Sequence, residues 1–298
     1  MKSWKIGAIA GLIAGIVLGI AAEYFNHVAL SMGLYDPWWR QFSINNVLVN
    51  IPLFGFWGIV LGIIYSKVYE LVPGKGISKG LVYGLFFYFI NMVRMATFHL
   101  AYARILDGAG YIFQGFFTWL IWGLVLGVLY EYLSGRFYPI KKEVKIITYD
   151  IISGILPGAI AGFCGGLAAS IFQVMGHATG YWGTQAASGE LVSTIEYWWS
   201  QVGTHLFINM IWGVIFGAIF AKVYNLVPGK KFKKGFYYGL IIFFITSFEL
   251  GTIGVSWLLN HNAWEMAVIT AGASWITGGA NGIVFALVLG LLYRKPPK

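Results

Sequence analysis

Apolar residues occur in eight long stretches, and the short segments between them carry most of the charged side chains. The stretches lie near residues 6–25, 44–69, 77–100, 112–133, 151–175, 203–226, 235–259 and 264–293. A helix needs about 20 mainly apolar residues to cross a hydrocarbon core roughly 30 Å thick, so each stretch is long enough to span a membrane. No stretch alternates between apolar and polar residues over the length of a barrel strand. The pattern predicts an all-α integral membrane protein with eight transmembrane helices.

The composition supports this class. Of 298 residues, 58% are hydrophobic and only 10% are charged, whereas a soluble domain carries about 25% charged residues. These values exclude a cytosolic globular protein and a disordered chain. The single cysteine, Cys164, excludes a disulfide framework and a metal cluster built from cysteines.

The charged residues predict an orientation. With both termini in the cytoplasm, 17 of the 20 basic residues and 4 of the 11 acidic residues lie on the cytoplasmic side. The opposite side then holds Arg40 and Arg104 with six acidic residues, among them Glu23 and Asp107. Because short cytoplasmic loops are enriched in Lys and Arg, we expect both termini to face the cytoplasm, most simply in a prokaryotic cell membrane.

The same distribution bears on binding partners. Basic residues are spread over every predicted cytoplasmic loop instead of forming one patch, which favours the lipid bilayer and its anionic headgroups as partners. No nucleic-acid partner is expected, although a pI near 9.4 occurs in proteins that bind nucleic acid.

The second half of the chain repeats the first. Trp57-Gly58 recurs as Trp212-Gly213, and the segment 71–75 (LVPGK) recurs at 226–230, each 155 residues later. The first and fifth stretches match at an offset of 151, and the fourth and eighth match at 163. So many identities at nearly constant offset indicate an internal duplication.

Each repeat holds four predicted helices, and an even number returns the chain to its starting side. The two repeats are therefore expected to be parallel, with a pseudo-twofold axis along the membrane normal. This divides the chain into a first four-helix repeat at 1–135, a cytoplasmic linker at 136–150 and a second four-helix repeat at 151–298.

Glycines fall at a spacing of four residues on single helix faces. Gly7, Gly11, Gly15 and Gly19 form one such series, and the fifth stretch carries another. Small residues let membrane helices approach closely, so the series predicts helix packing in a glycine zipper. A narrow pore lined by glycine is the alternative.

Two charged residues fall inside the predicted spans. Arg94 and Glu249 are repeat counterparts at the offset of 155, so one position of the repeat carries opposite charges in the two halves. A charge at the centre of a span costs about 2.5–3.5 kcal/mol on translocon scales, which favours pairing of the two. We predict a contact between them, either as an ion pair that docks the two repeats or as a coupling site for protons or ions.

Further polar residues lie at a similar depth: Asn50, Asn91, His99, His205, Asn209 and Thr246, with Ser247 beside the last. Asn50 and His205 are repeat counterparts, as are Asn91 and Thr246. Buried polar groups need partners, so the set predicts either a polar cavity open to the outside or hydrogen bonds between helices.

Two weaker candidate sites remain. His27 and His177 lie at the outer ends of the first and fifth stretches, where they could ligate a haem iron or, with Glu23, a metal ion, or could form interfacial hydrogen bonds. The turns near Lys75, Lys79, Lys230 and Lys234 precede helix N-termini, which favour phosphates of lipids or ligands. Helix termination by Pro-Gly is the alternative there.

Two function classes stay open. Parallel duplication with charges inside the spans favours a small-solute or ion transporter or channel that has a polar site between the repeats. The absence of a catalytic residue pattern favours a non-catalytic accessory or scaffold subunit of a larger membrane complex, which binds other integral membrane proteins or lipids. A homo-oligomer is compatible with either class. An enzyme is not expected, nor is a cofactor.

Overall fold

The computed structural model describes residues 2–34, 44–101, 105–137, 150–178, 195–230, 232–248 and 264–293. All regular secondary structure in these ranges is helical. The elements are α1 (Ser3–Ser31), α2 (Ile44–Val68), η1 (Tyr69–Leu71), α3 (Ile77–Phe87), η2 (Tyr88–Val93), α4 (Arg94–Ala101), α5 (Ile105–Phe137), α6 (Ile152–Ala178), α7 (Ile195–Val223), α8 (Phe232–Phe243), η3 (Phe244–Phe248) and α10 (Trp264–Leu292).

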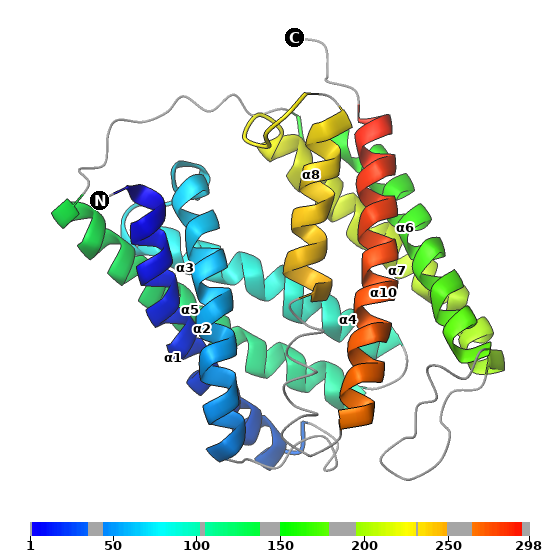
Figure 1. The fold of residues 1–298 in the computed structure, drawn as a ribbon, viewed down its shortest axis with the longest axis horizontal. Helices are drawn as coiled ribbons and strands as arrows, with labels where there is room; N and C mark the ends of the chain where they lie inside the picture. Colours follow the sequence, from blue (N-terminus) through cyan, green and yellow to red (C-terminus); the bar gives the residue numbers. More distant parts are fainter. Residues whose placement is uncertain are drawn as a thin grey trace. The chain divides into compact units, whose positions relative to one another are not determined.

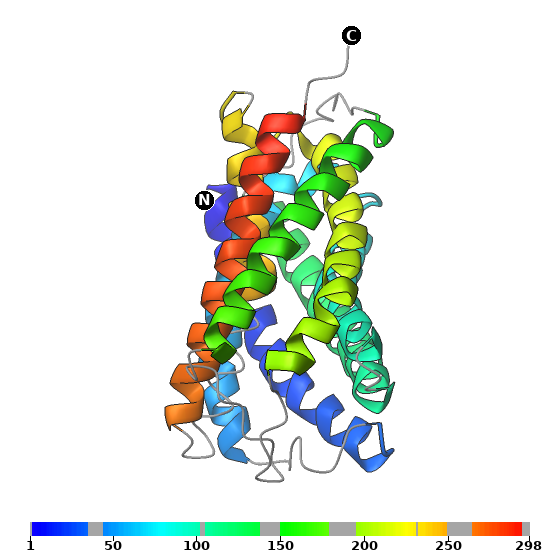
Figure 2. The ribbon, with the colours of Figure 1, turned by 90° about the vertical axis from the view of Figure 1, so that its right-hand side faces the viewer.

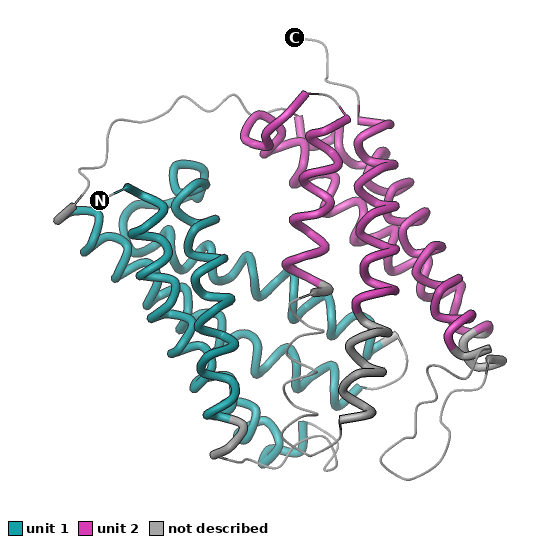
Figure 3. The backbone as a smooth tube through the Cα atoms, viewed as in Figure 1, with its two compact units in different colours: residues 1–146 teal, residues 147–298 magenta. Residues whose placement is uncertain are grey.

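The chain forms two compact units, residues 1–146 and 147–298, drawn in teal and magenta in Figure 3. In unit 1, α1 packs against α2 and α5, and α3 packs against α5. In unit 2, α6 packs against α7 and α10, and α8 packs against α10. The close pairs α1/α2 and α6/α10 can be followed in Figures 1 and 2.

Within the described residues, seven helices are long and apolar enough to cross a membrane. They are Ser3–Ser31, Val47–Leu71, Ile77–Leu100, Ile105–Gly135, Ile152–Gly176, Gln201–Val223 and Trp275–Leu292. The chain is therefore a multi-pass integral membrane protein. The remaining stretch expected from the sequence, 235–259, begins in α8 and η3 and continues into residues outside the described ranges, so a count of eight stays a prediction.

Glycine backbones form the contact between α1 and α2. A Cβ added to Gly11 would overlap the carbonyl oxygen of Gly58, and one added to Gly7 would overlap that of Gly62. In membranes such close approach replaces the hydrophobic effect as the main source of helix association. Any larger side chain at these positions would force the two helices apart.

The same kind of contact joins α6 and α7. A Cβ on Gly158 would overlap the carbonyl oxygen of Gly213, and one on Gly154 would overlap that of Gly217. In unit 1, Gly80 of α3 lies against Gly123 and the backbone of Gly127 in α5. The glycine faces that the sequence predicts thus pack on other helices within each unit.

Aromatic side chains fill the rest of each core. Trp57, Trp119 and Trp122 are fully buried in unit 1, and Trp119 and Trp122 meet edge to face with ring centroids 5.3 Å apart. Phe220 and Phe285 are buried in unit 2. Such large buried rings give the described parts of both units a densely packed interior.

A π-helical turn follows α3 in unit 1 and α8 in unit 2. η2 separates α3 from α4, and η3 follows α8 directly. π-turns are rare inside α-helices and occur often at functional sites. Two residues of the polar set expected from the sequence lie in these turns: Asn91 is within η2 and Thr246 is within η3.

Candidate functional site

A buried carboxylate lies between α1 and α2 in unit 1. Glu23 is 1% exposed, and Asn50 Nδ2 donates a hydrogen bond to Glu23 Oε2 at 3.4 Å. Glu23 continues the four-residue spacing of the glycines in α1, which explains why its side chain faces α2. Asn26, one turn further along α1, is 4% exposed.

Polar groups of α5 border the same end of α1. Gln114 Nε2 donates to the carbonyl oxygen of Ala22 at 3.1 Å, and Thr118 Oγ1 donates to the carbonyl oxygen of Gln114 at 2.7 Å. Both side chains are buried. The α1/α2/α5 junction therefore holds a cluster of buried polar residues: Glu23, Asn26, Asn50, Gln114 and Thr118, hereafter the junction cluster.

Asn91 and Arg94 lie on the third helix of unit 1. Asn91 is buried, and Arg94 begins α4 directly after η2. The Arg94 guanidinium lies over the Phe98 ring, 5.5 Å from its centroid. Its Nε is buried, with no hydrogen-bond partner among the described residues. Glu249 lies outside the described residues, so the expected contact between Arg94 and Glu249 stays a prediction.

A second carboxylate of unit 1 is also buried. Asp107, in the first turn of α5, is 1% exposed, and its Oδ2 lies 3.9 Å from Nδ1 of His99 on α4. The ring of His99 stacks at a tilt on Tyr111, with centroids 4.8 Å apart. Glu23 and Asp107 were expected at the outer ends of their helices, facing water. Instead both side chains are buried, Glu23 beside Asn50 of α2 and Asp107 beside His99 of α4.

Unit 2 has its own polar contacts. Asn281 Nδ2 of α10 donates to Asn209 Oδ1 of α7 at 2.9 Å, and Asn209 Nδ2 donates to the carbonyl oxygen of His205 at 2.8 Å. Thr246 Oγ1 donates to the carbonyl oxygen of Ile242 at 2.7 Å. The structure thus joins Asn209 and His205 through one chain of hydrogen bonds, and Thr246 bonds within its own helix. The Ser247 side chain is not described.

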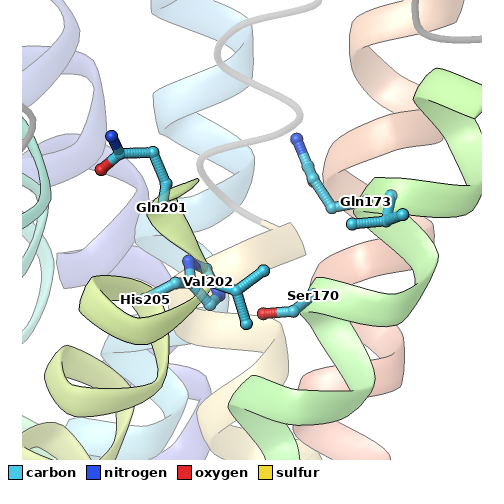
Figure 4. Close-up of a pocket in the computed structure, with 6 residues that line it drawn as sticks. Ser170, Gln173, Gln201, Val202 and His205 are labelled. Carbon is cyan, nitrogen blue, oxygen red and sulfur yellow. The ribbon is translucent and has the colours of Figure 1, made fainter. Parts of the chain in front are cut away.

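A small pocket opens between α6 and α7. It is lined by Ser170, Gln173, Val174, Gln201, Val202 and His205. Figure 4 shows Ser170 and Gln173 reaching from α6, and His205, Val202 and Gln201 from α7. The enclosed space holds about one water molecule. His205 therefore borders a small pocket within unit 2, and the polar cavity open to the outside that the sequence suggested stays a prediction.

The lysines of the two Pro-Gly turns differ in exposure. Lys75 and Lys230 are exposed, whereas Lys79 is 9% exposed and its Nζ donates to the carbonyl oxygen of Tyr69 at 2.8 Å. Lys234 Nζ likewise donates to the carbonyl oxygen of Tyr224 at 2.6 Å. The ammonium groups of Lys79 and Lys234 thus bond to the end of the preceding helix. Phosphate binding at these turns stays a prediction.

The histidines expected as metal or haem ligands are placed only in part. His27 is exposed, whereas Glu23 one turn before it is buried. The His177 side chain is not among those described. Within the described ranges, no three His, Cys, Asp or Glu side chains are grouped closely enough to hold a metal ion.

Sequence reasoning missed most of the junction cluster. From the sequence, Glu23 is a candidate only as a metal ligand beside His27 and His177, but its place against α2 follows from its position as the fifth member of the series through Gly7, Gly11, Gly15 and Gly19. Gln114 and Asn281 carry no comparable signal. Their roles depend on which helices pack together.

Comparison with protein-family models, with curated proteins and with solved structures finds no match to this chain.

Proposed function

We propose that this multi-pass membrane protein is a transporter or channel for a small solute or ion, built from two duplicated four-helix repeats with a polar site between them. The observation that carries the proposal is the burial of ionisable side chains within the apolar helices of unit 1. Glu23, the Arg94 Nε and Asp107 are all buried. Ionisable residues inside membrane helices are costly, and they commonly mark ion or substrate pathways.

Matching contacts within the two units support the duplication. Tyr83 Oη donates to the carbonyl oxygen of Leu61 at 3.0 Å, and Tyr238 Oη donates to that of Phe216 at 2.8 Å. Each of these residues is separated from its counterpart by 155 positions. Lys79 and Lys234 bond the carbonyl oxygens of Tyr69 and Tyr224 in the same relation.

The glycine contacts refine the alignment of the repeats. Gly11 lies on Gly58 in unit 1, and Gly158 lies on Gly213 in unit 2. With Gly58 and Gly213 as counterparts at 155, Gly11 and Gly158 are counterparts at 147. This register differs by one helical turn from the offset of 151 that the sequence match favours. It pairs His27 with Val174 instead of His177, which weakens the idea of two equivalent histidine ligands.

Flux measurements on purified protein in liposomes test transport. We expect gradient-driven movement of protons, read with an enclosed pH-sensitive dye, or of sodium, potassium or chloride, read with ion-selective electrodes. Glu249→Gln and Arg94→Gln are expected to reduce the flux, whereas Glu70→Gln, at an exposed position, is the matched control. Flux no greater than in empty liposomes for all four ions would contradict an ion transporter or channel.

An accessory or scaffold subunit is the second candidate. The densely packed glycine and aromatic interior of each unit favours it, because such packing supports a rigid membrane anchor. Mild solubilisation from native membranes, followed by size-exclusion chromatography, discriminates between the two functions. A stable complex with other integral membrane proteins supports the accessory subunit, and a free monomer or homo-oligomer supports the transporter.

The proposal includes an orientation and a lipid environment. Both termini face the cytoplasm, most simply in a prokaryotic cell membrane. Exposed lysines such as Lys75 and Lys230 meet anionic headgroups there, at about 1 kcal/mol per basic residue near the surface.

A further inference from the structure

We propose that Glu23, Asn26 and Asn50 form a binding site for a small monovalent cation, either a proton or Na⁺. This inference deepens the proposed transport function, on which it rests, by naming the class of ion and its site. It concerns unit 1 alone and requires no contact between the units.

The helix geometry brings the three side chains together. Glu23 and Asn26 are three residues apart on α1, so they are neighbours on one helix face. Asn50 reaches the Glu23 carboxylate from α2 at 3.4 Å. The glycine contacts hold α1 close to α2 up to Gly19, where a Cβ would lie 3.0 Å from the carbonyl oxygen of Asn50. The site is therefore attached to a tightly packed pair of helices.

The chemistry of the cluster suits a hard cation. Carboxylate and amide oxygens are the ligands that hard cations prefer. A carboxylate in an apolar bundle is costly when charged, and a bound proton or Na⁺ reduces that cost. The side chain of Asn26 is 4% exposed and lies one helical turn from Glu23 on the same face of α1, so the proposal assigns its amide oxygen as the second ligand from this helix.

The other titratable residues on the helices that form the site lie elsewhere along those helices. His27 follows on α1 and is exposed, and Asp107 lies two turns before Gln114 on α5, beside His99 of α4. Lys67 of α2 and Glu131 of α5 lie at the opposite helix ends, where Glu131 accepts a hydrogen bond from Tyr69. Glu23 is thus the carboxylate that the junction cluster itself contributes.

The counterpart position in unit 2 is neutral or basic. In the contact register, Ser170 replaces Glu23, Gln173 replaces Asn26 and His205 replaces Asn50. These residues line the pocket between α6 and α7. Duplication has thus placed polar side chains at the same point of both repeats, but only the first carries a carboxylate. We expect cation binding in unit 1 and not in unit 2.

Thermal unfolding of the purified protein tests the site, because an ion that binds the native state raises the unfolding temperature. Wild type is titrated with NaCl at constant ionic strength, with choline chloride as the replacement salt, and separately with acid. We expect the unfolding temperature of wild type to rise with Na⁺, or to rise with proton concentration relative to Glu23→Gln. The Glu70→Gln control is expected to behave as wild type, and Ser170→Ala likewise.

A milder variant keeps the test decisive if Glu23→Gln does not fold. Asn50→Ala leaves the carboxylate but removes both the Nδ2–H group that donates to Glu23 Oε2 and the amide oxygen proposed as a Na⁺ ligand. It should raise the half-saturating Na⁺ concentration about tenfold, because one ligand is lost. It should lower the half-saturating proton concentration, because a hydrogen bond that favours the charged carboxylate is lost. A sodium response identifies Na⁺, and an acid response without a sodium response identifies the proton. Identical responses of wild type, Glu23→Gln and Asn50→Ala to both ions would overturn the proposal. Because no flux is measured, the site can be confirmed even where transport fails, and the reverse also holds.

Discussion

At the residue scale, two carboxylates have the clearest consequences. Glu23 occupies the position that a fifth glycine would take in α1, so the face that brings α1 against α2 also buries the carboxylate. Asp107 is buried beside His99 at the start of α5. In the sequence Glu23 lies near the end of the first apolar stretch and Asp107 lies between the third and the fourth, where exposure to water is the natural expectation. The helices extend beyond those stretches, and their packing buries the charges.

The two lysines of the first Pro-Gly turn provide a residue-scale prediction. Lys79→Ala should lower the free energy of unfolding by about 1.5–3 kcal/mol, since it removes a hydrogen bond from a charged donor to the carbonyl oxygen of Tyr69. Lys75→Ala, at an exposed position, should change it by less than about 0.5 kcal/mol. Denaturant titration in detergent measures both. Equal effects of the two substitutions would contradict a structural role for Lys79.

At the scale of elements, helix pairing depends on glycine. In the α1/α2 and α6/α7 pairs the backbones of the two helices are in direct contact, and there is no room for a Cβ atom at Gly11 or Gly158. The sequence predicts that these faces pack, because small residues recur every fourth position. It does not predict which helix each face packs on, or in which register. By their glycine contacts, α1 and α6 correspond at an offset of 147 residues, one helical turn from the offset of 151 that matching residues favour. The π-turns η2 and η3 were not predicted either, because they depend on local helix packing.

Substitution of single glycines tests the helix pairing. Gly11→Ala should lower the free energy of unfolding by about 1–3 kcal/mol, because the added methyl group overlaps the backbone of Gly58. Gly203→Ala adds a methyl group where nothing lies within 4 Å, and should be neutral or stabilising by up to about 1 kcal/mol. Chemical unfolding of the two variants in the same detergent gives the comparison. If Gly11→Ala is as stable as Gly203→Ala, the glycine contact is not tight.

At the scale of the whole molecule, the chain consists of two units with matching internal contacts and different polar chemistry. Among the described side chains, unit 1 has buried carboxylates, whereas the polar contacts of unit 2 are made by amide, hydroxyl and imidazole groups. Charge distribution predicts the orientation, because the predicted cytoplasmic loops carry 17 of the 20 basic residues.

Cysteine labelling tests this orientation. In a Cys164→Ala background, Ser31→Cys at the end of α1 and Ser78→Cys at the start of α3 introduce exposed thiols. A membrane-impermeant maleimide added to intact cells should label Ser31→Cys, whereas Ser78→Cys should react only after the membrane is permeabilised. The reverse pattern would invert the predicted topology.

The sequence alone determined the class of this protein and most of its helices. Span length, low charge and basic loops are local properties that follow from the chemistry of the bilayer, so they can be recognised without a fold. The tertiary structure decided which polar groups meet: Asn50 with Glu23, Asn281 with Asn209, and His99 with Asp107. Residues so distant in sequence become neighbours through the register and crossing of packed helices, and those depend on backbone contacts that no single segment specifies.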